Sequence, residues 1–127
     1  MLEIVKRGCV PTDEKEFSPA NTVLLQQVQQ DIVYLINRDY DLGRSVTFAC
    51  NRFGFSTRQR MALIRSTATR DKIESRIKKE IGRDLKNKTI HIDGFNLIII
   101  LEIALSGTTL LRCMDGTIRN LAGLKSP

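Results

Sequence analysis

The expected fold is decided by the stretch Ile90-His91-Ile92-Asp93-Gly94-Phe95-Asn96. Its two isoleucines alternate with polar neighbours, and this period of two predicts a short strand over residues 89–93. Asp93 then stands at the carboxyl end of that strand, where open α/β sheets bind their ligands. The glycine that follows permits a sharp turn, and Asn96 places a donor and an acceptor near the carboxylate. We therefore expect the functional site of the protein to lie at residues 90–96.

Two further elements are expected after this stretch. The apolar run Leu97 to Leu105 is rich in β-branched residues, which favour a strand. Its length and the closing Ser106-Gly107 instead favour a buried helix. Residues 109–114 and 117–121 alternate around Asp115-Gly116, and this pattern predicts a β-hairpin with a tight turn.

Four helices are expected before the strand at residues 89–93. Each begins with a residue that caps helices well, namely Ser18, Asp41, Ser56 and Thr69. Gln59 follows Ser56 by three positions and completes a capping box, and Gly54 suits the end of the second helix. We expect an irregular arm over residues 1–17 and a helical region over residues 18–88. Ile73, Ile77 and Ile81 are predicted to form the inner face of the fourth helix.

The positive charge of the chain is concentrated in the middle. The net charge is +6, and residues 41–90 hold thirteen basic against five acidic residues. This excess indicates a surface for phosphates or another acidic partner, or else a solvated helical face. The candidate nucleic-acid-binding residues are Arg58, Arg65, Lys72, Arg76, Lys79 and Arg83. The last four recur at intervals of four, three and four, so they would form a stripe along one flank of a helix.

The segment HIDGFNLIIILEIALSG resembles a family catalogued as domain of unknown function 434. The stretches at Leu35–Tyr40, Cys50–Phe53 and Arg58–Leu63 are similar to the helical part of that family, so the resemblance covers roughly residues 28–123. It favours the helix over the strand for the run that begins at Leu97. IDGFN also resembles the opening strand of PIN-like and NYN nucleases.

These resemblances imply an α/β fold: an N-terminal bundle of about four helices, then a truncated PIN-like strand-helix-hairpin unit over residues 89–127. The first acid of IDGFN is a metal ligand in PIN-like enzymes, so Asp93 is the candidate ligand for Mg or Mn, with Asp115 as a second. A catalytic chain would be a divalent-metal-dependent ribonuclease. Asp93 could equally cap a helix. His91 and Asn96 are further candidates, and a structural role suits His91 as well.

The function expected from these features is interaction with nucleic acid, RNA rather than DNA, with or without cleavage. One alternative is a non-catalytic adaptor or ribonucleoprotein-associated protein. Another is a helix-turn-helix DNA-binding regulator, because a short connection joins the second and third helices. Half of a PIN-like sheet is missing, so we expect a homo-oligomer or docking onto a larger assembly.

The three cysteines are far apart and form no zinc-binding pattern, which is typical of a reduced, cytoplasmic protein. The sequence shows neither the apolar core of a signal peptide nor a stretch long enough to span a membrane. No membrane partner is therefore expected.

Overall fold

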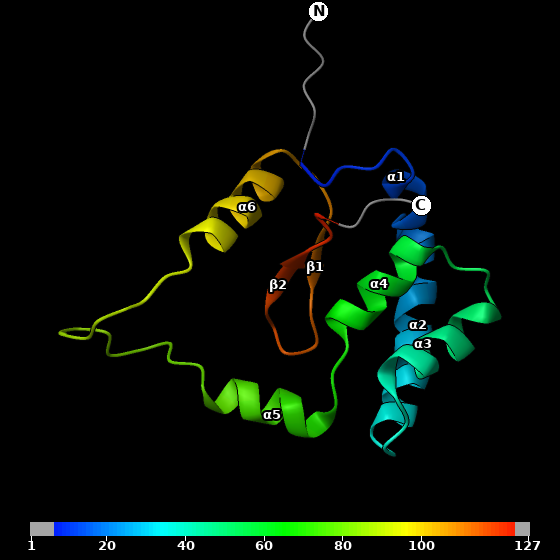
Figure 1. Cartoon of the computed structure of the whole chain (residues 1–127), viewed down its shortest axis with the longest axis horizontal. Coiled ribbons are helices and arrows are strands. Elements are labelled where there is room, and N and C mark those ends of the chain that lie inside the picture. Colours follow the sequence, from blue (N-terminus) through cyan, green and yellow to red (C-terminus); the bar gives the residue numbers. More distant parts are fainter. Residues whose placement is uncertain (1–6, 124–127) are drawn as a thin grey trace, which may run out of the picture.

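The computed structural model describes residues 7–123, which form a mixed α/β fold that is mostly helical (Figure 1). The helices are α1 (Asp13–Glu16), α2 (Pro19–Ile36), α3 (Leu42–Asn51), α4 (Thr57–Ser66), α5 (Arg70–Lys78) and α6 (Gly94–Leu105). The strands are β1 (Leu110–Arg112) and β2 (Ile118–Asn120). The hairpin lies beside α4, and α6 contacts it on the β2 side.

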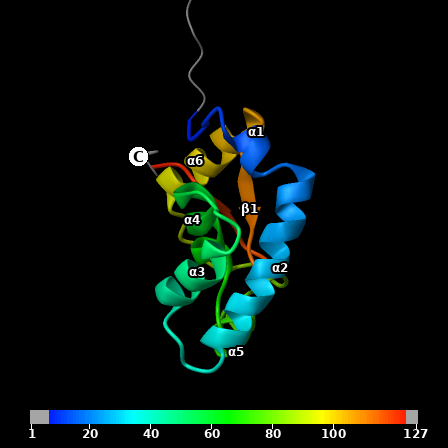
Figure 2. The ribbon, with the colours of Figure 1, turned by 90° about the vertical axis from the view of Figure 1, so that its right-hand side faces the viewer.

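The core is built by α2, α3 and α4, which pack against one another (Figure 2). One face of α2 is apolar at helical spacing, and this face is buried by the two shorter helices. The buried cluster consists of Leu25, Val28, Ile32, Ile36, Val46, Cys50, Phe55 and Leu63. The predicted helical region therefore does contain a packed core.

All four predicted caps are confirmed. The side chains of Ser18, Asp41, Ser56 and Thr69 each accept a hydrogen bond from the backbone N–H three residues on. The Ser56 cap is a full capping box, because Gln59 also accepts from the Ser56 backbone N–H at 2.9 Å. These bonds satisfy backbone donors that the first turn of a helix leaves without a partner.

The predicted hairpin is confirmed at its turn. The N–H of Cys113 donates to the carbonyl of Thr117 at 2.9 Å, and the strands pair antiparallel with Leu111 opposite Arg119. Gly116 has φ +82, a conformation that glycine adopts without strain. A three-residue loop closed by such a glycine is a common hairpin connection.

The predicted strand over residues 89–93 is wrong. These residues are irregular and exposed, with Ile90 58% and Ile92 67% exposed. A strand needs a neighbour to satisfy its backbone groups, and the only sheet in the described part of the chain pairs β1 with β2. The run from Leu97 is helical, as the resemblance implied. The PIN-like unit is not confirmed.

Two other expectations need correction. The predicted fourth helix is α5, and it has no buried residue. Ile77 and Ile81 are 52% and 64% exposed, because no other element covers that face. The arm is not wholly irregular, since α1 lies within it and Asp13 is buried. Residues 1–6 of the arm and 124–127 of the C-terminal region lie outside the described residues. Within residues 7–123, no helix has the length and apolar character needed to cross a membrane.

Candidate nucleic-acid interface

A basic pocket of about 240 Å³ lies where the C-terminal ends of α2 and α4 meet the start of α5 and the strand β2. Its apolar floor is formed by Ile36, Leu42, Ile64 and Ala68. Four cationic side chains line it, namely Arg65, Lys72, Arg76 and Arg119. They come from α4, α5 and β2, so the fold brings together charges that are as much as 54 residues apart in sequence.

Hydrogen bonds between neighbouring elements hold this pocket together. The side-chain oxygen of Asn37, at the end of α2, accepts from the backbone N–H of Arg70 at 2.9 Å and so fixes the start of α5. The backbone N–H of Met114 donates to the carbonyl of Ser66 at 3.0 Å, which ties the hairpin to the end of α4. Arg65 also donates to the Asn120 carbonyl. These bonds link the start of α5 and the hairpin to the packed helices α2 and α4.

One of the four cations already has an acidic partner. The guanidinium of Arg76 donates to the buried carboxylate of Asp115 at 2.9 Å. The hydroxyl of Thr117 donates to the same carboxylate at 2.6 Å, and this bond is the main reason that the pKa of Asp115 is lowered to about 2. Burial of Asp115 opposes that shift, while the Thr117 N–H and Arg76 add to it. Asp115 is thus ionised at neutral pH.

Two other cations are available to a ligand. Within residues 7–123, neither the Lys72 ammonium nor the Arg119 guanidinium is among the side chains that form ion pairs. Tyr40 lines the same pocket and is 61% exposed. An unpaired guanidinium and ammonium beside an exposed aromatic ring suit an anion that carries a flat group.

The pocket gathers three of the six residues predicted to bind nucleic acid, namely Arg65, Lys72 and Arg76. It adds Arg119 and Tyr40, which sequence reasoning missed. The hairpin prediction did place Arg119 within its second strand, over residues 117–121. The sequence of that strand does not show that Arg119 lies near α5, because this position depends on how the hairpin packs against α4.

The predicted stripe of basic residues was placed on the helix that is now α5, and it does not continue beyond the first turns of that helix. The helix ends at Lys78, so Lys79 occupies its cap position and Arg83 lies outside it. A stripe requires continued helical geometry, and the helix has already ended four residues before Gly82. Lys79 and Arg83 therefore do not continue the row of basic side chains that Lys72 and Arg76 begin on α5.

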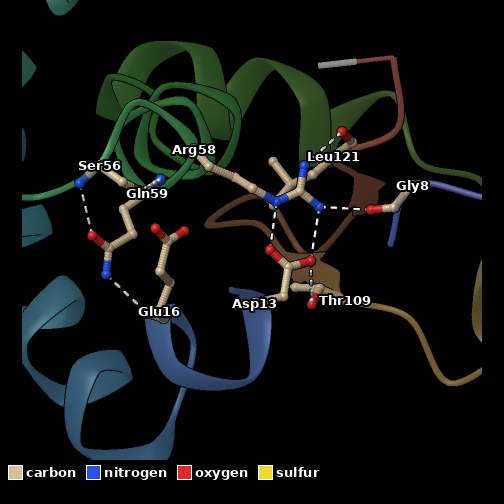
Figure 3. Close-up of polar contacts among 8 residues, drawn as sticks. All are labelled: Gly8, Asp13, Glu16, Ser56, Arg58, Gln59, Thr109 and Leu121. Carbon is tan, nitrogen blue, oxygen red and sulfur yellow. Dashed lines mark hydrogen bonds and ion pairs between the residues drawn. The ribbon is translucent and has the colours of Figure 1, made fainter. Parts of the chain in front are cut away.

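Arg58, which was predicted to bind nucleic acid, has a structural role in the fold. Arg58 is only 7% exposed, because its guanidinium is paired with Asp13 and donates to backbone carbonyls (Figure 3). Gln59 is buried beside it. A recognition helix must present the side chains of its first turns to the DNA groove, and α4 buries both Arg58 and Gln59. This burial does not favour the helix-turn-helix alternative.

Asp93 adopts the capping role. Its carboxylate accepts from the Asn96 backbone N–H at 3.3 Å and from the Asn96 side chain at 2.6 Å. Asp115 is occupied by its bonds to Thr117 and Arg76, as described above, and His91 is exposed in the irregular segment. Among residues 7–123, no three His, Cys, Asp or Glu side chains come close enough to hold a metal ion. Asp93 and Asp115, the residues predicted to bind Mg or Mn, thus already have hydrogen-bond partners within the protein.

A larger hollow of about 740 Å³ lies between α1, α2, α4 and the β1 strand. Two of its polar side chains are engaged within the protein: Asp13 pairs with Arg58, and Gln29 donates to the hydroxyls of Ser66 and Thr67 at 3.1 and 3.0 Å. Arg112 is the one basic residue in its lining, whereas four cations line the basic pocket.

The cysteines are all free thiols. Burial raises the pKa of Cys50 and of Cys113, so both remain protonated at neutral pH. Cys9 is exposed. The two buried thiols behave as small apolar side chains, and neither lies in the basic pocket.

Comparisons with known proteins give family relationships without a function. Residues 24–79 match the family described as Protein of unknown function (DUF434), and residues 82–127 match Domain of unknown function (DUF5616). Uncharacterized protein MJ0935 of Methanocaldococcus jannaschii is 34% identical over 97 residues, which cover 76% of this chain. They cover 47% of that relative, so the chain spans about half its length.

No solved structure matches the chain. The PIN-like resemblance of IDGFN is not confirmed by these comparisons. The match over residues 24–79 contains α3, α4 and α5 and most of α2, which are the helices that build the core and most of the basic pocket. The chain is therefore similar to the DUF434 family over residues 24–79 and to the archaeal relative over 76% of its own length.

Proposed function

We propose that the chain binds nucleic acid, RNA in preference to DNA, through the basic pocket. The observation that carries this proposal is the convergence of Arg65, Lys72, Arg76 and Arg119 around one hollow. Like charges repel, so folding them together against an apolar floor costs free energy that a bound anion would recover. Phosphates are the anions that such clusters of Arg and Lys bind in nucleic acids.

Two features support RNA over DNA. IDGFN resembles the opening strand of PIN-like and NYN nucleases, and the helix that would have to read a DNA groove buries its first turn around Arg58. The proposal stops at binding, because the carboxylates of Asp93 and Asp115 are committed to a helix cap and a turn. The similarity covers 47% of the archaeal relative, so any chemistry of that protein can lie outside the compared part.

The experiment is a salt titration of binding to a single-stranded oligoribonucleotide, with the matched DNA oligonucleotide beside it. Replacing both Lys72 and Arg119 by Gln should weaken binding and reduce the log–log salt slope by about 0.7 for each lost phosphate contact. Replacing Lys86 and Lys88, which lie in the segment between α5 and α6, is the charge-matched control. An unchanged slope in the pocket variant would overturn the proposal.

A second proposal is that α6 mediates self-association. We infer this from its apolar surface, since the only buried residue of α6 is Ile103. Exposed apolar side chains surround the rest of the helix, among them Phe95 at 84%, Ile98 at 62%, Leu101 at 50% and Leu105 at 89%. A helix that is apolar on all sides is normally buried, and an apolar patch of this kind marks an interaction site. Docking of α6 onto another protein is the alternative, as expected for an adaptor.

A further inference from the structure

The basic pocket is small for a run of nucleotides. Its volume of about 240 Å³ lies below the roughly 300–1,000 Å³ of pockets that enclose drug-sized ligands. It is deep enough to reach the side chains of Ile36 and Ile64, which are part of the helical layer. A single phosphate group with part of its sugar fits such a hollow. A nucleic-acid strand that must enter the pocket and leave it again does not fit as well.

The charge of the pocket matches a doubly charged anion. Four cations and no acidic residue are among its lining residues, and Arg76 is paired with Asp115. Three positive charges remain in excess. A terminal phosphate carries a charge of about −1.5 to −2 at neutral pH, whereas a phosphate within the chain carries one negative charge. Electrostatics therefore favours the end of a strand over its interior.

The rim of the pocket supplies a surface for a base. Tyr40 lies between the end of α2 and the start of α3, and its ring is largely exposed while it lines the pocket. Aromatic rings in this position stack on bases of any sequence. A nucleotide whose phosphate reaches Lys72 and Arg119 could place its base on this ring.

We propose that the pocket binds a terminal phosphate of RNA, a phosphomonoester, with the adjoining base stacked on Tyr40. This inference rests on the proposed function and adds the part of the RNA that is recognised. Arg119 and Lys72 contact the phosphate, and Arg65 and Arg76 set the potential around it. Both ends of an RNA strand can carry such a group, so the experiment separates them.

The test compares three oligoribonucleotides of one sequence, with a 5′-phosphate, a 3′-phosphate or hydroxyls at both ends. At fixed salt, one phosphorylated oligonucleotide should bind about tenfold more tightly than the unphosphorylated one, since charged hydrogen bonds of this kind are strong. The Lys72→Gln and Arg119→Gln variants should lose this preference. Tyr40→Ala should weaken binding but keep the preference, and Lys86→Gln should change neither.

The outcomes separate this inference from the proposed function. Equal binding of all three oligonucleotides would overturn the terminal-phosphate inference and leave RNA binding in place. Binding of none would overturn both. A phosphoserine peptide serves as the remaining arm: tight binding of this peptide without binding of RNA would show that the pocket recognises a phosphorylated protein, against both proposals. Circular dichroism of each variant verifies that the helices are intact.

Discussion

Arg58 and Asp13 are 45 residues apart in sequence and form a buried ion pair with two parallel hydrogen bonds. The second of these bonds joins the terminal nitrogen of Arg58 to Asp13 Oδ2 at 2.8 Å, and the same nitrogen donates to the Gly8 carbonyl at 2.7 Å. Gly8 has φ +70 and lies so close to Ala122 that a side chain would meet it at 3.1 Å. The pair thus fastens the arm to α4 and to the end of the hairpin.

Loss of this pair should destabilise the whole fold. Arg58→Ala leaves the Asp13 carboxylate buried without its counter-charge, and breaking a buried pair in this way costs about 3–5 kcal/mol. Arg58→Lys should also be destabilising, because an ammonium cannot form both bonds. Urea unfolding of these variants measures the effect, with exposed Arg52→Ala as the control. A change in the free energy of unfolding within about 0.5 kcal/mol would contradict the account.

The sequence reveals the local parts of this fold better than the distant ones. Ser18, Asp41, Ser56 and Thr69 were predicted as caps because a cap depends only on the next three residues. The strand over residues 89–93 failed because a strand depends on a partner that sequence periodicity does not identify. Likewise, the pattern around Arg58 gives no sign of Asp13, which the fold brings to it from a different element.

In the candidate site too, the features set by neighbouring residues were predicted and those set by distant contacts were not. Lys72 and Arg76 were placed on one flank of a helix by their spacing, and they share one pocket. Arg119 came from outside that pattern, because its position depends on how the hairpin packs. Asp93 was assigned both a metal and a capping role from sequence, and only its hydrogen bonds to Asn96 identify the cap.

The ionised Asp115 should give the hairpin a stability that depends on pH. Its pKa of about 2 in the folded state lies below the ordinary 3.8, so the stabilisation is present above about pH 4 and is lost as the pH falls toward 2. Asp115→Asn should therefore lower the free energy of unfolding by about 1 to 2 kcal/mol at pH 7 and by almost nothing at pH 2. Unfolding followed across this range measures it, with exposed Asp31→Asn as the control. A deficit of equal size at both pH values would contradict this assignment.

The capping role of Asp93 is separated from a metal-binding role by two substitutions. Asn caps helices as well as Asp does, so Asp93→Asn should leave stability and RNA binding nearly unchanged. Asp93→Ala should cost about 1 kcal/mol of helix stability. Thermal unfolding by circular dichroism, with and without magnesium or manganese, distinguishes the roles. If either ion raised the melting temperature of the native chain and not that of Asp93→Asn, Asp93 would be a ligand.

Self-association through α6 should be abolished by charge on its exposed face. Ile98→Lys and Leu101→Lys should convert an oligomer into a monomer without loss of stability, since both side chains are exposed in the single chain. Val23→Lys, on the exposed side of α2, is the matched control and should leave the oligomer intact. Sedimentation across a range of concentrations gives the mass. A native chain that stays monomeric at high concentration would contradict self-association.

The most direct test of the central claim is a titration of the native chain with single-stranded RNA, followed by NMR of the arginine and lysine side-chain nitrogens. The account predicts that the signals of the pocket cations Arg65, Lys72, Arg76 and Arg119 shift together as RNA is added. The signals of Arg83, Lys86 and Lys88, which lie between α5 and α6, should stay in place. Shifts confined to these three residues, with the pocket signals unmoved, would contradict the claim that the pocket is where the chain meets RNA.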